Sequence, residues 1–299
     1  NMVQEDTDFA VACAVPIDTP GLTIVARPAG RPGESGALFS ARYGQTTGLC
    51  LFDKVFVPWK HVFLCGEWMH VDHLTKSYAT HHRHTCIGAR AGFGDLLIGA
   101  GALMIEANGL SMTGNVNLRD TMVELIKVVE GFYACGVAAS VYGTEESAGN
   151  TMPEPVYANI GKLLLANQIY DMHRLAHTVS GGLIVTLPLP EDDHNPETGP
   201  DLALVLQGRP DVSYERRASV ARFIEDITAT DAGGWMSVIS LHGGGSPEAM
   251  KSEIHRRYPI PERRKLVERL IERGVASESS NRSTAQQPGQ CCDTGCTKE

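Results

Sequence analysis

The fold is organised around the sequence Tyr78-Ala-Thr-His-His-Arg-His-Thr-Cys-Ile-Gly-Ala-Arg-Ala-Gly-Phe-Gly-Asp95, which leads into an apolar run from Leu96 to Ala107. This run predicts a buried helix over residues 86–108. Three histidines and a cysteine crowd the start of that helix: His81, His82, His84 and Cys86. Imidazole and thiolate bind borderline metals, and they are acid–base groups near neutral pH. The stretch is therefore either a site of chemistry or a histidine-rich helix start on the surface.

The composition is that of an ordinary globular protein, since 42% of the 299 residues are hydrophobic and 20% are charged. The net charge is −9, and no Lys/Arg cluster alternates with aromatic residues, so we expect no nucleic-acid partner. Gly99, Gly101 and Glu106 interrupt the longest apolar run, so we expect no membrane span, which needs about 20 apolar residues. The eight cysteines are scattered, which favours a reducing, cytoplasmic location.

The first part of the chain reads as strands. β-Branched or alternating runs cover Phe9–Pro16, Gly21–Arg27 and Leu49–Pro58. A loop rich in glycine, proline and serine, Pro28–Ser40, lies between the second and the third run. Few strands joined by short turns predict part of an antiparallel barrel or sandwich.

The remainder of the chain has helical periodicity. After the helix over 86–108, a second helix is expected to begin at a cap formed by Asn117 or Asp120. Further helices are predicted over residues 154–178, 216–230, 231–242, 246–257 and 259–274. A proline-rich loop is predicted over 187–200. Strands followed by helices indicate an α+β fold rather than alternating βαβ units.

Two glycine-rich stretches are candidate ligand sites. Leu241-His-Gly-Gly-Gly-Ser-Pro247 precedes a helix whose free N–H groups suit a phosphate or carboxylate, although it also fits a plain turn. Ser180-Gly-Gly182 is either a cofactor contact or a helix stop. His173 and His177 share a helix face but lack the Glu of a zinc-protease motif. Cys291-Cys-Asp-Thr-Gly-Cys296 is a further metal candidate in the tail.

A series of motifs resembles one family of enzymes. In chain order they are Phe9-Ala-Val-Ala-Cys-Ala-Val-Pro-Ile-Asp-Thr-Pro-Gly-Leu-Thr23, Leu51-Phe-Asp-Lys-Val-Phe-Val-Pro58, His82-Arg83, Gly92-Phe-Gly-Asp95, Ser180-Gly-Gly-Leu183 and Leu241-His-Gly-Gly-Gly-Ser-Pro247. Together they resemble the 4-hydroxybutyryl-CoA dehydratase / vinylacetyl-CoA Δ-isomerase group, within the flavin-dependent 4-hydroxyphenylacetate 3-monooxygenase family. The resemblance runs over about residues 9–275.

The resemblance implies an acyl-CoA dehydrogenase-like fold, FAD and a homotetramer. By it, residues 1–70 are part of a middle β domain and 75–275 are a C-terminal helical bundle. The polar composition of residues 276–299, rich in Gln, Ser and Thr, predicts a disordered tail. The family's N-terminal helical domain is expected to be absent, which suggests a fragment or truncated product. FAD is expected at two stretches, whose residues are Ser180, Gly181, Gly182, His242, Gly243, Gly244, Gly245 and Ser246.

The dehydratase of this group holds a [4Fe–4S] cluster through two earlier cysteines, a histidine and a cysteine seven positions later. His82 matches the histidine, whereas Ala89 stands in place of that last cysteine and Cys86 comes four positions after His82. An intact cluster would require Cys86 as a substitute ligand. The resemblance therefore points to His82 as an acid–base residue and to His82 and Cys86 as metal ligands.

Three functions remain open at this stage. The first is a lyase or isomerase acting on 4-hydroxybutyryl-CoA or vinylacetyl-CoA. The second is an FAD-dependent monooxygenase that hydroxylates a phenol, as 4-hydroxyphenylacetate 3-hydroxylases do. The third is a truncated, non-catalytic paralogue.

Overall fold

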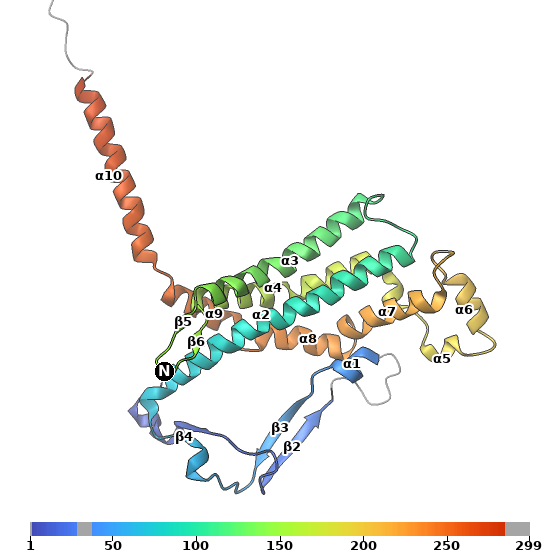
Figure 1. Ribbon diagram of the computed structural model, residues 1–299, viewed down its shortest axis with the longest axis horizontal. Coiled ribbons are helices and arrows are strands. Elements are labelled where there is room, and N and C mark those ends of the chain that lie inside the picture. Colours follow the sequence, from blue (N-terminus) through green and yellow to red (C-terminus); the bar gives the residue numbers. More distant parts are fainter. Residues whose placement is uncertain (1, 29–37, 285–299) are drawn as a thin grey trace, which may run out of the picture. The chain divides into compact units, whose positions relative to one another are not determined.

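The computed structural model describes residues 2–28 and 38–284 (Figure 1). The chain divides into two compact units, residues 1–256 and residues from Arg257 onward. The first unit contains the strands and most of the helices.

The N-terminal strands form two small antiparallel sheets. A 3₁₀ helix, η1 (Gln4–Phe9), precedes β1 (Val11–Cys13), which pairs with β4 (Val62–Cys65). β2 (Leu22–Arg27) pairs with β3 (Thr47–Phe52) from Leu22 opposite Phe52 to Arg27 opposite Thr47. In the described residues these sheets do not close the barrel or sandwich that we predicted. Their side chains are mostly exposed, and a two-stranded sheet alone buries too little apolar surface to form a core.

Two segments of this region differ from the sequence prediction. The short strand β4 was missed, because four residues are too few to show an alternating pattern. Helix α1 (Leu38–Tyr43) occupies the end of the predicted loop Pro28–Ser40 and the residues after it. Residues 29–37 of that loop lie outside the described part of the chain. A 3₁₀ turn, η2 (Trp59–His61), precedes β4.

The central element is helix α2 (Trp68–Ala107), 40 residues long. It begins 18 residues before the predicted start at Cys86, so the three histidines lie in the middle of the helix and not at its beginning. The physical reason is that residues 68–87 contain neither glycine nor proline, so nothing stops the helix upstream of the apolar run. The prediction followed hydrophobicity instead.

Helices α3 (Val116–Val141) and α4 (Pro155–Ser180) pack along α2 (Figure 1). Asn115 caps α3 through its side chain, which corrects the predicted cap at Asn117 or Asp120. Glu154 caps α4, and Gly181, at a φ of +76°, ends it as predicted. A short hairpin of β5 (Thr144–Glu145) and β6 (Thr151–Met152) connects the two helices.

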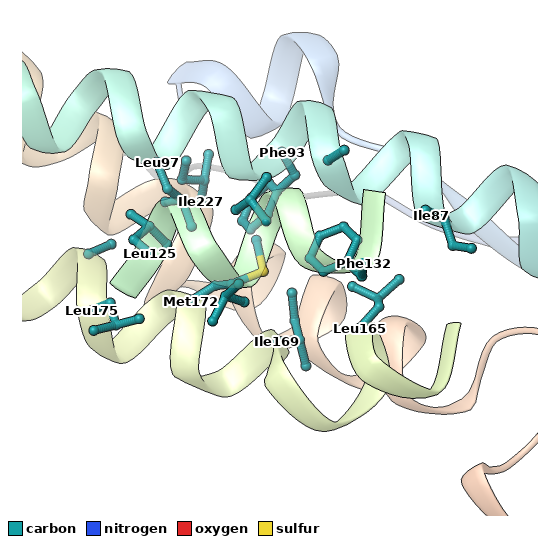
Figure 2. Close-up of a cluster of buried hydrophobic side chains, with 14 residues drawn as sticks. Ile87, Phe93, Leu97, Leu125, Phe132, Leu165, Ile169, Met172, Leu175 and Ile227 are labelled. Carbon is teal, nitrogen blue, oxygen red and sulfur yellow. The ribbon is translucent and has the colours of Figure 1, made fainter. Parts of the chain in front are cut away.

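The core lies where α2, α3 and α4 meet (Figure 2). Its large buried side chains are Ile87, Phe93, Leu97, Leu125, Phe132, Leu165, Ile169, Met172, Leu175 and Ile227. Gly161 lets α4 approach α2 closely, because an added Cβ would lie 2.5 Å from the Ile87 Cδ1 atom. Helix α2 is therefore a core helix, although its length and apolar composition alone would also fit a membrane span.

The chain then returns along the bundle. The elements are η3 (Gly182–Val185), α5 (Pro190–Asp193), α6 (Gly199–Val205), α7 (Tyr214–Thr228), α8 (Asp231–His242) and α9 (Pro247–Arg257). Helix α5 and the start of α6 occupy the predicted loop 187–200. This segment is anchored to α7, since Asp193 accepts a hydrogen bond from the Tyr214 hydroxyl at 2.5 Å and pairs with Arg222 at 2.7 Å.

The second unit contains helix α10 (Ile260–Thr284). It continues to Thr284, past the predicted end at Gly274, which corrects the predicted end of this helix. Residues 275–284 contain no proline or glycine that would end the helix. The remaining tail residues, including Cys291, Cys292 and Cys296, lie outside the described part of the chain. The predicted division at residues 70, 75 and 275 stays a prediction.

Candidate functional site

His82 and Cys86 lie one turn apart on the same face of α2. The His82 Nδ1 atom is 3.5 Å from the Cys86 Sγ atom, and both residues are half-buried. This geometry follows from the i, i+4 spacing on a helix. His84 points elsewhere, because its Nε2 atom lies 3.0 Å from the Ser140 hydroxyl on α3. The histidine-rich stretch therefore separates into one candidate pair and one structural contact.

The turn between α8 and α9 lies against this pair. Gly244 has a φ of +80°, and a Cβ added to it would lie 2.8 Å from the His82 Nδ1 atom, so the position requires glycine both for backbone conformation and for space. Arg83 fixes the turn by donating from Nε to the Gly244 carbonyl at 2.8 Å. Its Nη1 atom donates to the Oδ1 atom of Asn159 on α4 at 2.7 Å.

The other residues predicted in this turn have local roles. His242 is exposed at the end of α8, and the Gly243 N–H donates to the Ile239 carbonyl at 2.7 Å. A Cβ added to Gly245 would lie 3.0 Å from the Arg83 guanidinium. The Ser246 hydroxyl accepts a long hydrogen bond of 3.4 Å from the Ala249 N–H at the start of α9.

Three cations act on the pair, of which Arg83 belongs to a quoted motif and the other two were not predicted. We call Arg83, Arg90 and Lys162 the cation group. Lys162, on α4, is fully buried and donates to the Ser240 carbonyl at 2.5 Å. Arg90 donates from Nε to the hydroxyl of the same Ser240 at 2.7 Å. One signal was available: Lys162 interrupts the buried face that Ala158, Leu165 and Ile169 define at helical spacing.

The cation group sets the protonation of its neighbours. Burial lowers the pKa of His82, and the positive charges of Lys162, Arg83 and Arg90 lower it further. Burial also lowers the pKa of Lys162, to about 8, although the nearby Cys86 thiol opposes this shift. At neutral pH the His82 imidazole is therefore held in its neutral form, in which one ring nitrogen can accept a proton.

The second predicted cofactor stretch lies elsewhere in the first unit. Ser180 is 18 residues beyond Lys162 on α4, which is roughly 27 Å at about 1.5 Å per residue. Ser180 is buried, and its hydroxyl donates to the Ala176 carbonyl at 2.7 Å. No atom lies within 4 Å of a Cβ added to Gly181 or Gly182, so this backbone is open to approach. Within one chain the two glycine-rich stretches are thus separate.

The ligand set for an iron–sulfur cluster is incomplete in the described residues. No group of three or more His, Cys, Asp or Glu side chains that could hold a metal occurs in that part of the chain. A [4Fe–4S] cluster needs four ligands, whereas His82 and Cys86 offer two and Ala89 offers none. The residues present therefore do not fit the cluster.

Two cavities lie further along the first unit. One, of about 430 Å³, lies between α2 and α7, where Gly99 and Leu103 face Val220 and Phe223. The other, of about 160 Å³, lies between α1 and α8 and includes Tyr43 and Trp235. The His82–Cys86 pair lines neither of them.

The predicted pair His173 and His177 does not form a metal site. The His177 Nε2 atom lies 2.8 Å from the Thr228 hydroxyl, whereas the His173 Nδ1 atom lies 3.3 Å from the Ser237 hydroxyl. His173 is buried beside Phe93, and its Nε2 atom has no hydrogen-bond partner. Burial, with a smaller contribution from His177, lowers the pKa of His173 from 6.5 to about 4.

This shift predicts acid destabilisation. Between pH 6.5 and pH 4 the unfolded chain binds a proton at His173, whereas the folded chain does not. The free energy of unfolding therefore decreases by about 3 kcal/mol as the pH is lowered from 6.5 to 4. His173→Gln should remove this part of the slope in urea unfolding measured at several pH values. His255→Gln, at an exposed position on α9, is the control and should retain it. An unchanged slope in His173→Gln would show that another group is responsible.

Comparison with known proteins identifies the family to which this architecture belongs. The model of the 4-hydroxyphenylacetate 3-hydroxylase C terminal matches residues 71–272, and that of the N terminal matches residues 1–64. The 4-hydroxybutyryl-CoA dehydratase/vinylacetyl-CoA-Δ-isomerase of Clostridium aminobutyricum is 32% identical over 90% of this chain and 57% of its own length. The chain spans about half the length of the curated relatives it matches.

Solved structures agree with the sequence matches. An oxygen-tolerant archaeal 4-hydroxybutyryl-CoA dehydratase from N. maritimus aligns with a TM-score of 0.84 at 30% identity, over 91% of this chain and 55% of its own. The oxygenase component of 4-hydroxyphenylacetate 3-monooxygenase, in complex with FAD and 4-hydroxyphenylacetate, aligns with a TM-score of 0.79 at 21% identity, over 91% and 57% of the two chains.

These likenesses define an acyl-CoA dehydrogenase-like fold, as the motifs predicted. The chain belongs to the 4-hydroxyphenylacetate 3-hydroxylase family. The family resemblance drawn from the sequence motifs is thereby confirmed.

Proposed function

We propose that this chain belongs to an FAD-binding enzyme that isomerises a short unsaturated acyl-CoA thioester without an iron–sulfur cluster. The observation that carries the proposal is the neutral His82 beside Cys86 and the Gly244 turn, together with Ala89 where the cluster requires a cysteine. The greater identity to the dehydratase/isomerase, 32% against 26% for a Thermus thermophilus monooxygenase, supports the thioester as substrate.

The chemistry assigned to His82 is a proton shift. In a 3-enoyl thioester such as vinylacetyl-CoA, the imidazole would remove a proton from C2, and the electron pair of that bond would delocalise onto the thioester oxygen. Return of the proton to C4 then moves the double bond from C3=C4 to C2=C3. A base with a lowered pKa suits this role, because it is unprotonated at neutral pH.

FAD would be held by the open backbone of Gly181 and Gly182 and by the glycine turn Gly243–Gly245. The isolated positions of these stretches in one chain favour a site completed by another subunit, consistent with the proposed homotetramer. Exposed apolar side chains on α2 and α3, such as Leu103, Val123 and Val137, support association. When bound, FAD supplies redox chemistry that side chains lack. Light scattering of the purified protein would give the subunit number.

The first experiment is an ultraviolet–visible spectrum with iron and sulfide analysis on anaerobically purified protein. We expect a flavin spectrum without iron. About four irons per subunit would contradict the cluster-free site, and absence of flavin would favour the non-catalytic paralogue. Turnover of vinylacetyl-CoA to crotonyl-CoA, with no conversion of 4-hydroxybutyryl-CoA, would then distinguish isomerisation from dehydration.

His82→Ala is expected to lower kcat for this isomerisation by about 10²- to 10⁴-fold, because the acid–base group is lost. His84→Ala is the matched control, since its imidazole contacts α3 rather than the pair. The measurement is the initial rate of crotonyl-CoA formation at saturating substrate. Equal rates for the two variants would show that His82 is not the acid–base residue of this reaction.

The alternative is an aromatic hydroxylase that uses reduced FAD and oxygen. It is favoured by the alignment with the oxygenase that binds FAD and 4-hydroxyphenylacetate. Catechol formation from a phenol, dependent on reduced FAD and oxygen, would establish it.

A further inference from the structure

Two members of the cation group, Lys162 and Arg90, are buried without a carboxylate partner in the described residues, whereas Arg83 interacts with the charge of Glu253. Neither Lys162 nor Arg90 forms an ion pair with a carboxylate in the part of the chain that the structure describes. Both instead donate to Ser240, one to its carbonyl and one to its hydroxyl. Burying a cation without an anionic partner is costly, so the arrangement needs a reason beyond the hydrogen bonds to Ser240.

The donors of these two residues exceed the acceptors that they meet. An ammonium group has three N–H donors and a guanidinium has five, whereas the described contacts use one nitrogen of each residue. Arg83, the third member, is already engaged with Gly244 and Asn159. The free donating capacity therefore belongs to Lys162 and Arg90.

Arg90 on α2 and Lys162 on α4 both lie near the Cys86 thiol. Cys86 interacts electrostatically with both Lys162 and Arg90, and its Sγ atom lies 3.5 Å from the His82 Nδ1 atom. The groups on α2 that interact with Lys162 are Cys86, Arg90, Arg83 and His82, and from α8 it meets the uncharged Ser240. Among the described residues, the acidic group that acts on both Lys162 and Arg90 is the Cys86 thiol.

We propose that Lys162 and Arg90 form an anion-stabilising wall that holds a ligand oxygen in its negatively charged form beside His82 and Cys86. This inference rests on the proposed function, in which proton removal by His82 places negative charge on a thioester oxygen. A phenolate oxygen would present the same chemistry. The wall acts by lowering the free energy of the oxyanion relative to the neutral ligand.

The protonation of Lys162 supports this assignment. Burial lowers its pKa to about 8, so the ammonium stays mostly charged at neutral pH although burial disfavours the charged form. An anion beside it would favour the charged form and so bind more tightly than a neutral ligand of the same shape. A lysine that only capped the end of α8 through Ser240 would not discriminate between the two ligand forms.

Two chromophoric probes test the wall without any turnover. 4-Nitrophenol turns yellow when it ionises, and the enolate of acetoacetyl-CoA absorbs in the near ultraviolet. Each probe is titrated with wild-type protein at a pH below its ionisation midpoint in water. We expect at least one probe to bind as the anion, with an apparent affinity that falls about 10- to 100-fold in Lys162→Met.

Matched variants separate the charge from the packing. Lys162→Arg keeps a cation and should retain most of the anion band, whereas Lys127→Met removes an exposed lysine of α3 that pairs with Glu124 and should change nothing. If Lys162→Met does not fold by circular dichroism, Arg90→Met provides the same readout. Absence of an anion band in wild type, or an equal band in the charge-removing variant, overturns the wall.

The two probes also separate this inference from the function on which it rests. Ionised 4-nitrophenol with no binding of acetoacetyl-CoA would confirm the wall and reject the thioester substrate. Ionised acetoacetyl-CoA would support both.

Discussion

Replacing Phe132 with alanine is expected to lower the free energy of unfolding by about 3–5 kcal/mol. Phe132, on α3, is fully buried and lies in the core cluster shared by α2, α3 and α4 (Figure 2). Its ring packs among side chains of three helices, so truncation removes the apolar burial and also leaves a cavity. Helix α4 lies close to α3 at Gly161, because a Cβ added to this glycine would be 3.2 Å from the Phe132 carbonyl oxygen.

Urea unfolding followed by circular dichroism measures this loss. Tyr133→Ala is the control, because the next residue on the same helix is 45% exposed and should lose much less stability. The two variants remove aromatic rings of similar size from opposite environments. Similar losses in both would mean that the packing of α3 against α2 and α4 is not what stabilises the first unit.

Replacing Asp226 with alanine is expected to cost about 2–5 kcal/mol. Asp226, on α7, is buried, and its Oδ2 atom accepts hydrogen bonds from the Phe39 N–H at 2.9 Å and the Ser40 N–H at 2.7 Å. Its Oδ1 atom accepts a third from the Ser40 hydroxyl at 2.5 Å. Loss of the carboxylate leaves these buried donors unsatisfied, and each costs about 1–3 kcal/mol.

Hydrogen exchange makes this test specific to α1. In Asp226→Ala, the amides of Phe39 and Ser40 should lose protection, because the carboxylate is their acceptor across 186–187 residues of sequence. Asp171→Ala is the control, since that exposed carboxylate pairs only with Arg174 on its own helix and such pairs contribute little. Retained protection at Phe39 would mean that α1 is held by its aromatic contacts, such as Phe39 with Phe223.

The helices that carry local start and stop signals were predicted closely. Helix α8 spans Asp231–His242 as expected, because Thr230 caps its beginning through its hydroxyl. Helix α9 begins at Pro247 after Ser246, again as expected. The start of α2 was wrong by 18 residues, since its N-terminal half has no apolar stripe and only the absence of helix breakers indicates it.

The candidate site was predicted in part. The stretch with His82 and Cys86 was found because two reactive side chains four residues apart share a helix face whatever the tertiary fold. Gly244 was also selected, although its contact with His82 spans more than 160 residues and no pattern in the sequence indicates it. Lys162 was missed, since its partners Ser240 and Cys86 belong to other helices.

By itself, the sequence determined that most of the chain after the strands is helical, where the glycine turns lie, and the resemblance to the family. These depend on backbone conformation and on residues a few positions apart, whose effects are local. Only the tertiary structure decided that Lys162 and Arg90 meet at Ser240 behind His82, and that Ser180–Gly182 lies far from Gly244. The burial of a side chain and the charges around it depend on which helices pack together. The residue spacing within one helix does not determine that packing.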